Sequence, residues 1–197
     1  MYGRDPDRAR TTEGYADAVQ DWRRRRADVC ERLVLDELAD GQVGAFLVWG
    51  DPALYDGTIG IVEDIVRRGQ VELDWHVIPG ISSISALAAR HRIGLNQVGG
   101  AVQVTTGRRL QAGLPDDVDD VVVMLDAHAA FARVDDPDLQ IYWGAYVGTP
   151  DELLISGPLG QVADQILAAR AEAQERKGWI MDSYLLRRSS GAGGDGS

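Results

Sequence analysis

Residues with the chemical character of a ligand site follow an uncharged apolar run over residues 43–49. Gly50 permits close backbone approach, Pro52 stiffens the turn, and Asp51 offers a carboxylate to a ligand or to a helix end. Apolar residues then recur at helical spacing over residues 58–67. In open α/β sheets, ligands bind where strands end in this way. The turn alone is equally typical of an ordinary strand-to-helix connection.

A second turn of the same kind follows residues 71–78, which alternate between apolar and polar side chains as a strand does. The run ends at Pro79 and Gly80, and Ser82 and Ser83 precede an Ala-rich segment typical of a helix. Their hydroxyls can cap that helix or contact a ligand. Two consecutive strand ends with small polar turns predict one shared crevice.

The remaining periodicity predicts an α/β protein built of two α/β units. Domain boundaries fall at 1–99 for the first unit and 100–188 for the second, with a Gly- and Ser-rich tail over 189–197 that we expect to be disordered. The first unit should contain helices over 15–38, 58–68 and 84–92 and strands over 43–49 and 71–78. The second should contain strands over 101–106, 119–125, 139–147, 152–156 and 179–186, with helices over 127–133 and 159–176.

Composition excludes several classes of function. Among 197 residues the formal net charge is −11, with a pI near 4.6, so the chain is not expected to bind nucleic acid as basic proteins do. An anionic small ligand remains compatible, because local basic residues decide that; the run Arg23 to Arg26 itself is typical of a solvated helix face. Cys30 is the only cysteine, which leaves no disulfide and no cysteine-based zinc site, and we predict no metal site.

No apolar stretch approaches the roughly 20 residues that a membrane helix needs. The first ten residues are polar and charged, unlike a signal peptide. These features favour a cytoplasmic protein with no membrane partner.

Four motifs together resemble the tetrapyrrole methylase family, the methyltransferases of corrin and porphyrin synthesis. They are residues 49–55 (Trp-Gly-Asp-Pro-Ala-Leu-Tyr), 77–83 (Val-Ile-Pro-Gly-Ile-Ser-Ser), 106–108 (Thr-Gly-Arg) and 123–125 (Val-Met-Leu). All four fall in the family's order, and the resemblance extends over about residues 15–188. It implies two α/β domains with a cleft between them that binds S-adenosylmethionine (SAM), the methyl donor.

The resemblance also implies which residues contact the two substrates. The SAM contacts would be Trp49, Gly50, Asp51, Leu54, Ser82, Ser83, Met124, Gly148 and Thr149. Met124 taken by itself is more typical of a hydrophobic core. Tyr55 and Arg108 would meet the anionic tetrapyrrole, whose carboxylates suit a guanidinium, and Arg90 and Arg92 are further candidates.

Within the family, residues 46–56 and 178–182 are similar to members that act in cobalamin synthesis. Those members methylate C1 of precorrin-5 and release acetate, giving precorrin-6A. Methyl transfer to a ring carbon is an in-line displacement in which the macrocycle is the nucleophile, so the protein's main task is orientation. Acetate release needs water and a base. Asp56, Tyr55 and His91 are the nearest titratable residues to the motifs, and the sequence does not choose among them.

One departure from the family pattern concerns the start of the chain. The family's first domain opens with an apolar strand and a Gly-rich loop, and nothing before Tyr15 matches them. We therefore expect an incomplete, N-terminally truncated first domain. Loss of an inner strand would expose apolar edges such as residues 43–49, which predicts poor solubility or a large homodimer interface.

Three readings of function remain open from the sequence. The chain is an active methyltransferase, or a non-catalytic remnant of the family that serves at most as a dimerisation or binding module, or a nucleotide- or phosphate-binding α/β protein. The third is disfavoured because the chain lacks the Gly-x-x-x-x-Gly-Lys-Ser/Thr phosphate loop.

Overall fold

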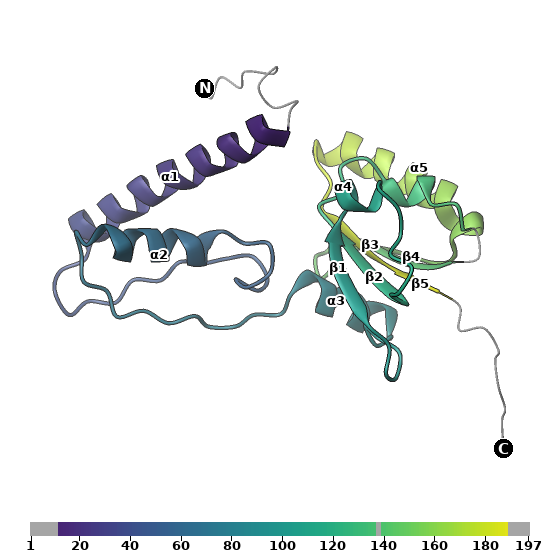
Figure 1. Cartoon of the computed structure of the whole chain (residues 1–197), viewed down its shortest axis with the longest axis horizontal. Coiled ribbons are helices and arrows are strands. Elements are labelled where there is room, and N and C mark those ends of the chain that lie inside the picture. The colour runs from purple at the N-terminus through teal and green to yellow at the C-terminus, as the bar shows by residue number, and fades with distance from the viewer. Residues whose placement is uncertain (1–11, 137–138, 189–197) are drawn as a thin grey trace. The chain divides into compact units, whose positions relative to one another are not determined.

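A computed structural model describes residues 12–136 and 139–188, with side chains described from residue 19 onward. The chain divides into two compact units, the first ending at Gly80 and the second beginning at Ile81 (Figure 1). The predicted tail over 189–197 lies outside the described residues. Within the described part, no helix has both the length and the apolar character needed to cross a membrane.

The first unit is built around two helices, α1 (Thr12–Glu37) and α2 (Thr58–Arg68). They pack together around Ala27, Ile61 and Ile65, none of which is more than 2% exposed. α2 ends because Gly69 takes the left-handed conformation (φ 69°) and donates its N–H to the carbonyl of Val66. Both predicted helices are therefore confirmed.

The predicted strands over 43–49 and 71–78 are wrong: neither segment belongs to a sheet. A strand exists only when a neighbour completes its hydrogen-bond ladder, and no described residue does so for either segment. Val43 is 92% exposed and Leu47 96% exposed, whereas Val71 and Leu73 pack against the small helical core. The apolar pattern is present, but the described chain leaves most of residues 43–49 exposed, and only Val48 is half-buried.

The second unit contains a five-stranded mixed sheet in the order β1-β2-β5-β3-β4. β1 and β2 are parallel, and the other neighbouring pairs are antiparallel. Since β5 runs opposite to both β2 and β3, the carboxyl ends of β1, β2 and β3 lie at one edge of the sheet. The strands are β1 (Val102–Thr106), β2 (Asp120–Met124), β3 (Gln140–Ala145), β4 (Leu153–Pro158) and β5 (Asp182–Arg187).

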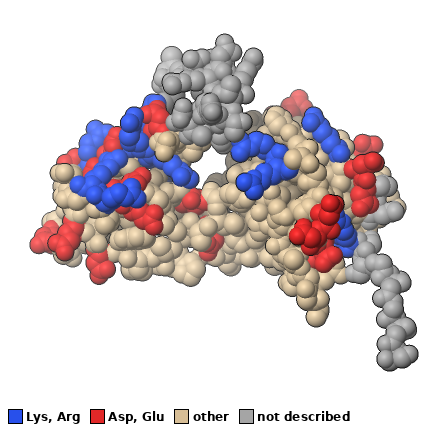
Figure 2. All heavy atoms as spheres, in the orientation of Figure 1, with Lys and Arg blue, Asp and Glu red and all other residues tan. Residues whose placement is uncertain are grey.

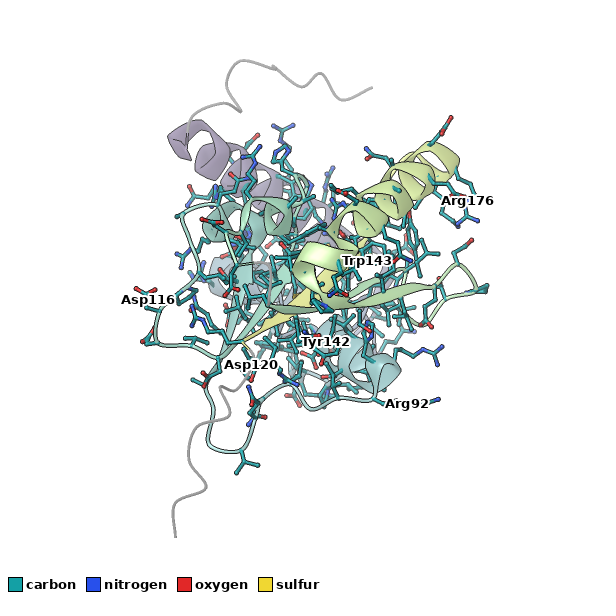
Figure 3. All side chains as sticks on the ribbon, turned by 90° about the vertical axis from the view of Figure 1, so that its right-hand side faces the viewer. Arg92, Asp116, Asp120, Tyr142, Trp143 and Arg176 are labelled. Atoms are coloured by element: carbon teal, nitrogen blue, oxygen red, sulfur yellow. The ribbon has the colours of Figure 1, made fainter. Side chains whose placement is uncertain are left out.

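Helices cover both faces of this sheet. α4 (Gly107–Leu110), the 3₁₀ helix η2 (Ala130–Arg133) and α5 (Leu159–Lys177) lie on one face, and α3 (Ser83–His91) lies on the other (Figure 1). Neighbouring residues of β3 therefore point to opposite layers, Trp143 toward α5 and Tyr142 toward α3, as Figure 3 shows. Trp143 is fully buried in the main hydrophobic core.

Two differences from the sequence analysis follow from contacts in this unit. α3 packs on β3, β4 and β5, so the chain divides after Gly80, whereas the predicted domain boundary lies at residue 99. The helix predicted over 127–133 is only the short η2. The carboxylate of Asp126 accepts hydrogen bonds from the backbone N–H groups of His128 (3.1 Å) and Ala130 (2.6 Å), which holds these residues in a turn.

A buried polar network joins α5 to the sheet. The guanidinium of Arg170 forms an ion pair with Asp182 and donates a hydrogen bond to the carbonyl of Asp126 (2.7 Å). The Trp143 indole also donates to Asp182 (2.7 Å), and the Tyr184 hydroxyl donates to the Asp126 carboxylate (2.6 Å). Burial, with the neighbouring Asp126 carboxylate, raises the pKa of Tyr184 far above its ordinary value, so Tyr184 remains a donor.

The network predicts a large stability effect at Arg170. Arg170→Met should lower the free energy of unfolding of the second unit by about 3–5 kcal/mol, because it leaves the Asp182 carboxylate buried without its cation. Urea unfolding followed by fluorescence, to which the buried Trp143 contributes, measures this loss. Arg176→Met on the same helix is the control: Arg176 is 55% exposed and lies 3.6 Å from Asp151, so its loss should cost less than about 1 kcal/mol. Equal losses in the two variants would contradict the role given to Arg170.

The uncovered apolar segment predicts self-association of the purified chain. Exposed apolar extended backbone is a template for pairing between molecules. Light scattering after gel filtration should therefore show a mass that rises with concentration, and Leu47→Lys should reduce that rise. Glu63→Lys is the control for the added charge, since Glu63 is an exposed residue of α2. A wild-type chain that stays monomeric at all concentrations would disprove this expectation.

Candidate functional site

The carboxylate of Asp51 holds the two predicted turns of the first unit together. Oδ1 accepts a hydrogen bond from the N–H of Ala53 (2.8 Å), and Oδ2 accepts one from the N–H of Gly80 (2.9 Å). The sequence offered Asp51 as a ligand contact or a helix cap; in the structure it joins the turn after residue 49 to the turn after residue 78. Gly50 has a φ of 80°, a conformation that favours glycine.

The two turns also meet through their backbones. A Cβ atom placed on Gly80 would lie 2.1 Å from the carbonyl oxygen of Gly50, far inside van der Waals contact. Only glycine at position 80 allows this approach, so the Pro-Gly pair of the second turn has a steric role beside the first turn.

Side chains around the Asp51 turn divide into buried and exposed groups. Pro52 is buried, whereas Trp49 is 74% exposed and Tyr55 48% exposed. Tyr55 has a φ of 54°, which is strained for a residue other than glycine and is often found at functional sites. Asp56 accepts a hydrogen bond from the N–H of Thr58 (2.7 Å) at the start of α2. The surface of this turn is therefore formed by two exposed aromatic side chains.

In the second unit, Ser82 caps α3. Its Oγ accepts a hydrogen bond from the N–H of Ser85 (3.2 Å), as its sequence position predicts, and Ser83 is the first helical residue. Leu87 lies over Gly144 near the end of β3. The chain after the helix reaches the opposite edge of the sheet, where Arg187 donates to the carbonyl of Gly94 (2.9 Å). The N-terminus of α3 is thus directed toward the edge where β1, β2 and β3 end.

That edge brings together most of the residues predicted in the second unit. Register pairs Thr106 with Met124, Met124 with Ser183, and Asp182 with Ala145. Gly107 and Arg108 continue from β1, Leu125 from β2, and Gly148 and Thr149 from the turn after β3. β1, β2 and β3 therefore end at one edge of the sheet, where Met124 closes β2 and Arg108 lies two residues beyond β1.

Strained backbone is concentrated at the same edge. Leu125 has a φ of 53° and is 65% exposed, and Tyr146 has a φ of 50°. Strain of this kind persists where surrounding contacts enforce it. For Leu125 those contacts come from the buried Asp126 next to it. For Tyr146 they are the N–H donated to the carbonyl of Met181 (2.9 Å) and the hydroxyl donated to that of Trp179 (2.5 Å).

An ion pair fixes the turn that contains Gly148. Nε of Arg90 donates to both carboxylate oxygens of Glu152 (2.7 and 2.9 Å), and the N–H of Gly148 donates to Glu152 as well (2.8 Å). The hydrogen bond from Arg90, with that from Gly148, lowers the pKa of Glu152 from its ordinary 4.5. Arg90, considered for substrate binding, is thus engaged within the protein.

His91 lies away from the edge. Its Nε2 is 2.9 Å from the carbonyl oxygen of Trp143, and its ring packs edge-on against Tyr142. Among the three candidates for a base, His91 is the one that the structure ties to the body of the sheet.

Sequence reasoning missed Leu125, Asp126 and Tyr146 as parts of this edge. Leu125 is the last residue of the Val-Met-Leu motif, but the apolar pattern predicts it as the end of a strand. No local signal marks Asp126 or Tyr146, because their roles come from contacts with residues distant in the chain.

Comparison with known proteins decides the family. A sequence profile described as Tetrapyrrole (Corrin/Porphyrin) Methylases matches residues 5–163, which is most of the chain. The chain belongs to the tetrapyrrole methylase family.

Relatives of this tetrapyrrole methylase include two methylases named for steps on precorrins. It is 53% identical over 183 residues to a precorrin-6A synthase [deacetylating] from Sinorhizobium sp., covering 92% of this chain and 70% of the relative. It is 27% identical to a precorrin-4 C(11)-methyltransferase from Rhodococcus erythropolis, covering 77% and 66% of the two chains.

Solved structures agree with the fold. The crystal structure of a cobalamin synthesis related protein (CobF) from Corynebacterium diphtheriae superposes with a TM-score of 0.80 at 36% identity, covering 87% of this tetrapyrrole methylase and 72% of that chain. A uroporphyrin-III-C-methyltransferase from Thermus thermophilus gives 0.57 at 21% identity, with 81% and 67% covered, a likeness of fold alone. The predicted α/β class and the predicted family are thereby confirmed.

The Arg90–Glu152 pair predicts a pH-dependent contribution to the stability of this tetrapyrrole methylase. Because the folded pKa of Glu152 lies below 4.5, the pair stabilises the fold above that pH and is lost as the pH falls through the folded pKa. Glu152→Gln should lower the melting temperature at about pH 7, and the difference from wild type should shrink toward about pH 3. Glu175→Gln, at an exposed position of α5, should show no such trend. A difference independent of pH would contradict the assignment.

Proposed function

We propose that this chain is a SAM-dependent C-methyltransferase of corrin synthesis, which methylates precorrin-5 at C1 and releases acetate to give precorrin-6A. The observation that carries the proposal is the 53% identity, over 92% of the chain, to a precorrin-6A synthase [deacetylating].

The edge of the sheet where β1, β2 and β3 end is called here the strand-end edge. Its residues fit a ligand that is partly apolar and partly cationic, as SAM is. Leu125 offers an exposed apolar side chain, Gly148 offers a backbone free of side-chain bulk, and the strand ends offer carbonyl dipoles. SAM, when bound, supplies the methyl group that is transferred to a ring carbon. No carboxylate or thiolate nucleophile is needed from the protein, because the macrocycle supplies the electron pair.

The chain's own residues have binding and positioning tasks in this proposal. Trp49 and Leu54 contact SAM by their apolar surfaces, and Asp51 keeps their turn against Gly80. Met124, Ser82, Ser83, Gly148 and Thr149 complete the proposed SAM contacts. Correct placement of the methyl carbon against C1 can contribute roughly 7–11 kcal/mol to lowering the barrier.

The substrate carries several carboxylates, and Tyr55 and Arg108 are proposed to bind them. A guanidinium binds a carboxylate through two parallel hydrogen bonds. Arg108 is exposed at the start of α4, and Tyr55 is exposed beside the Asp51 turn. Both can therefore be reached by a ligand.

Acetate release requires a group that accepts a proton from water. Asp56 is proposed for this step among the three candidates. One of its oxygens accepts the N–H of Thr58, which fixes the carboxylate while the second oxygen can accept a proton. His91 is less suitable because its Nε2 contacts the carbonyl of Trp143.

A second candidate function is a homodimer-forming or binding module without catalysis. The uncovered residues 43–49, with Leu47 96% exposed, favour it, because such a segment invites pairing with another chain. A homodimer is compatible with both functions.

Calorimetry with S-adenosylhomocysteine, followed by a precorrin-5 assay that measures acetate, tests the proposal. Wild type should bind at micromolar concentration and release acetate. Trp49→Ala should weaken binding by about tenfold or more, since an aromatic contact contributes 1–2 kcal/mol or more. Trp75→Ala is the matched control, because Trp75 is a partly exposed tryptophan of the same unit outside the proposed contacts.

The outcomes separate the two functions. Asp51→Asn keeps one acceptor oxygen and loses one of the two bonds from Ala53 and Gly80, so this variant should weaken binding by disturbing the turn. A folded wild-type chain that binds no S-adenosylhomocysteine would exclude the methyltransferase and leave the non-catalytic module. Binding without acetate release would retain the SAM site and reject the deacetylating reaction.

A further inference from the structure

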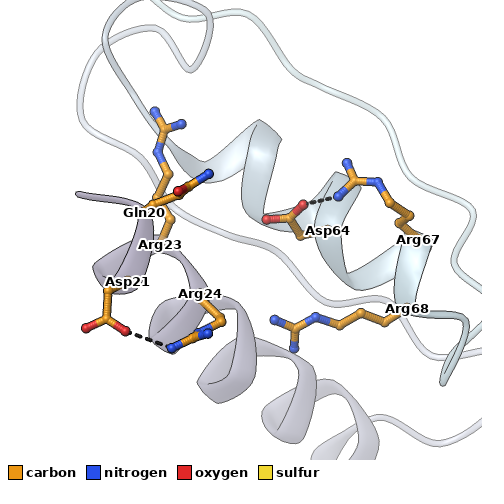
Figure 4. A pocket seen from close by; sticks show the side chains of 7 residues that line it. All are labelled: Gln20, Asp21, Arg23, Arg24, Asp64, Arg67 and Arg68. Carbon is orange, nitrogen blue, oxygen red and sulfur yellow. Dashed lines mark hydrogen bonds and ion pairs between the residues drawn. The ribbon is translucent and has the colours of Figure 1, made fainter. Parts of the chain in front are cut away.

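A pocket of the first unit lies in the groove between α1 and α2. Its volume is about 620 Å³. Arg24 of α1 and Arg68 of α2 point toward each other across it, as Figure 4 shows, and Arg23 and Arg67 also line it. Two aspartates and Gln20 complete the lining. Four arginines thus line one groove of a chain whose net charge is −11.

The charges in the groove do not balance. Asp21 is shared between Arg24 and Arg25, and Asp64 pairs with Arg67. Among the described side chains, no carboxylate forms an ion pair with Arg23. Asp28 and Glu31, outside the lining, neutralise Arg68, so the excess positive charge comes from Arg23 and from the sharing of Asp21 by two arginines. Figure 2 shows the Lys and Arg side chains gathered on the face over α1 and α2.

One of the four guanidinium groups, that of Arg68, is held in place by ion pairs. Arg68 is 29% exposed and pairs with both Asp28 and Glu31 at 2.8 Å. Nε of Arg23 lies near Gly57, 3.9 Å from where a Cβ of that residue would be. The helices that carry these arginines are themselves fixed by the packed Ala27 and Ile65. Arg68 is therefore already ordered before an anion binds, which lowers the entropic cost of binding.

The lining also limits the kind of ligand. All seven lining residues are polar or charged, so the groove has no aromatic or aliphatic wall for a base or a hydrocarbon chain. Guanidinium groups prefer the planar, paired oxygens of phosphates and carboxylates. Arginines on both walls match a ligand with negative charge at both ends.

We propose that this groove binds a small oxyanion with two or more adjacent negative charges, a diphosphate or a tricarboxylate. The site is separate from the Asp51 turn and does not depend on the proposed methyl transfer. The run Arg23 to Arg26, which the sequence assigns to a solvated face, contributes one wall of it.

Calorimetric titration at about 20 mM ionic strength tests the site, with inorganic pyrophosphate in one arm and citrate in the other. Tighter binding of pyrophosphate identifies a phosphate site, and tighter binding of citrate a carboxylate site. The double variant Arg23→Gln, Arg67→Gln should weaken the preferred anion about tenfold or more, because it removes one charge-assisted contact from each wall. Added salt should weaken the wild type more than the variant.

The control variant, Arg133→Gln with Arg176→Gln, also removes two positive charges, but from the second unit. It should change the affinity less than about twofold. Unchanged melting temperatures would show that the groove variant folds, as expected because the Arg67–Asp64 pair is an exposed surface contact. Absence of binding of both anions by wild type would overturn the proposal. Equal weakening in the control would do the same, since the effect would then come from net charge.

Discussion

The arrangement of the strand-end edge depends on the buried guanidinium of Arg170. It binds the carboxylate of Asp182, which begins β5, and the carbonyl of Asp126, which follows β2. Burial raises the pKa of Asp182, while the Arg170 charge opposes that rise. One cation from α5 thus fixes the ends of two neighbouring strands, and the residues proposed to bind SAM in this unit lie on the turns that these ends begin.

The first unit is stabilised by other interactions than a buried ion network. Its buried core of Ala27, Ile61 and Ile65 is small, and its extended segments have no strand ladder among the described residues. Under these conditions single contacts matter more, and the carboxylate of Asp51 is such a contact because it joins two turns 29 residues apart in the chain. The two units therefore represent two ways to hold a turn: a buried ion network and a half-exposed carboxylate.

Local sequence signals correctly predicted the ends of helices, because a helix cap depends on contacts within a few residues. Gly69 ends α2 and Ser82 begins α3 as their positions in the sequence indicate. The apolar pattern of residues 43–49 predicted a strand that the structure does not contain. A strand needs a neighbouring strand to complete its hydrogen bonds, and a local pattern holds no information about that neighbour. The motifs correctly located Asp51 and Gly148 in turns. They could not reveal the role of Asp126, which depends on an arginine 44 residues away, or the groove formed when Arg23 meets α2.

The contact between Gly80 and Gly50 has a consequence for how such sequences diverge. A side chain at position 80 would occupy the space of the Gly50 carbonyl, so position 80 can change only if the chain around Gly50 takes another path. The two turns are thus expected to vary as a pair across related proteins. A relative with a larger residue at position 80 would have a rebuilt Gly-Asp-Pro turn, and its ligand preference could not be transferred from this chain position by position.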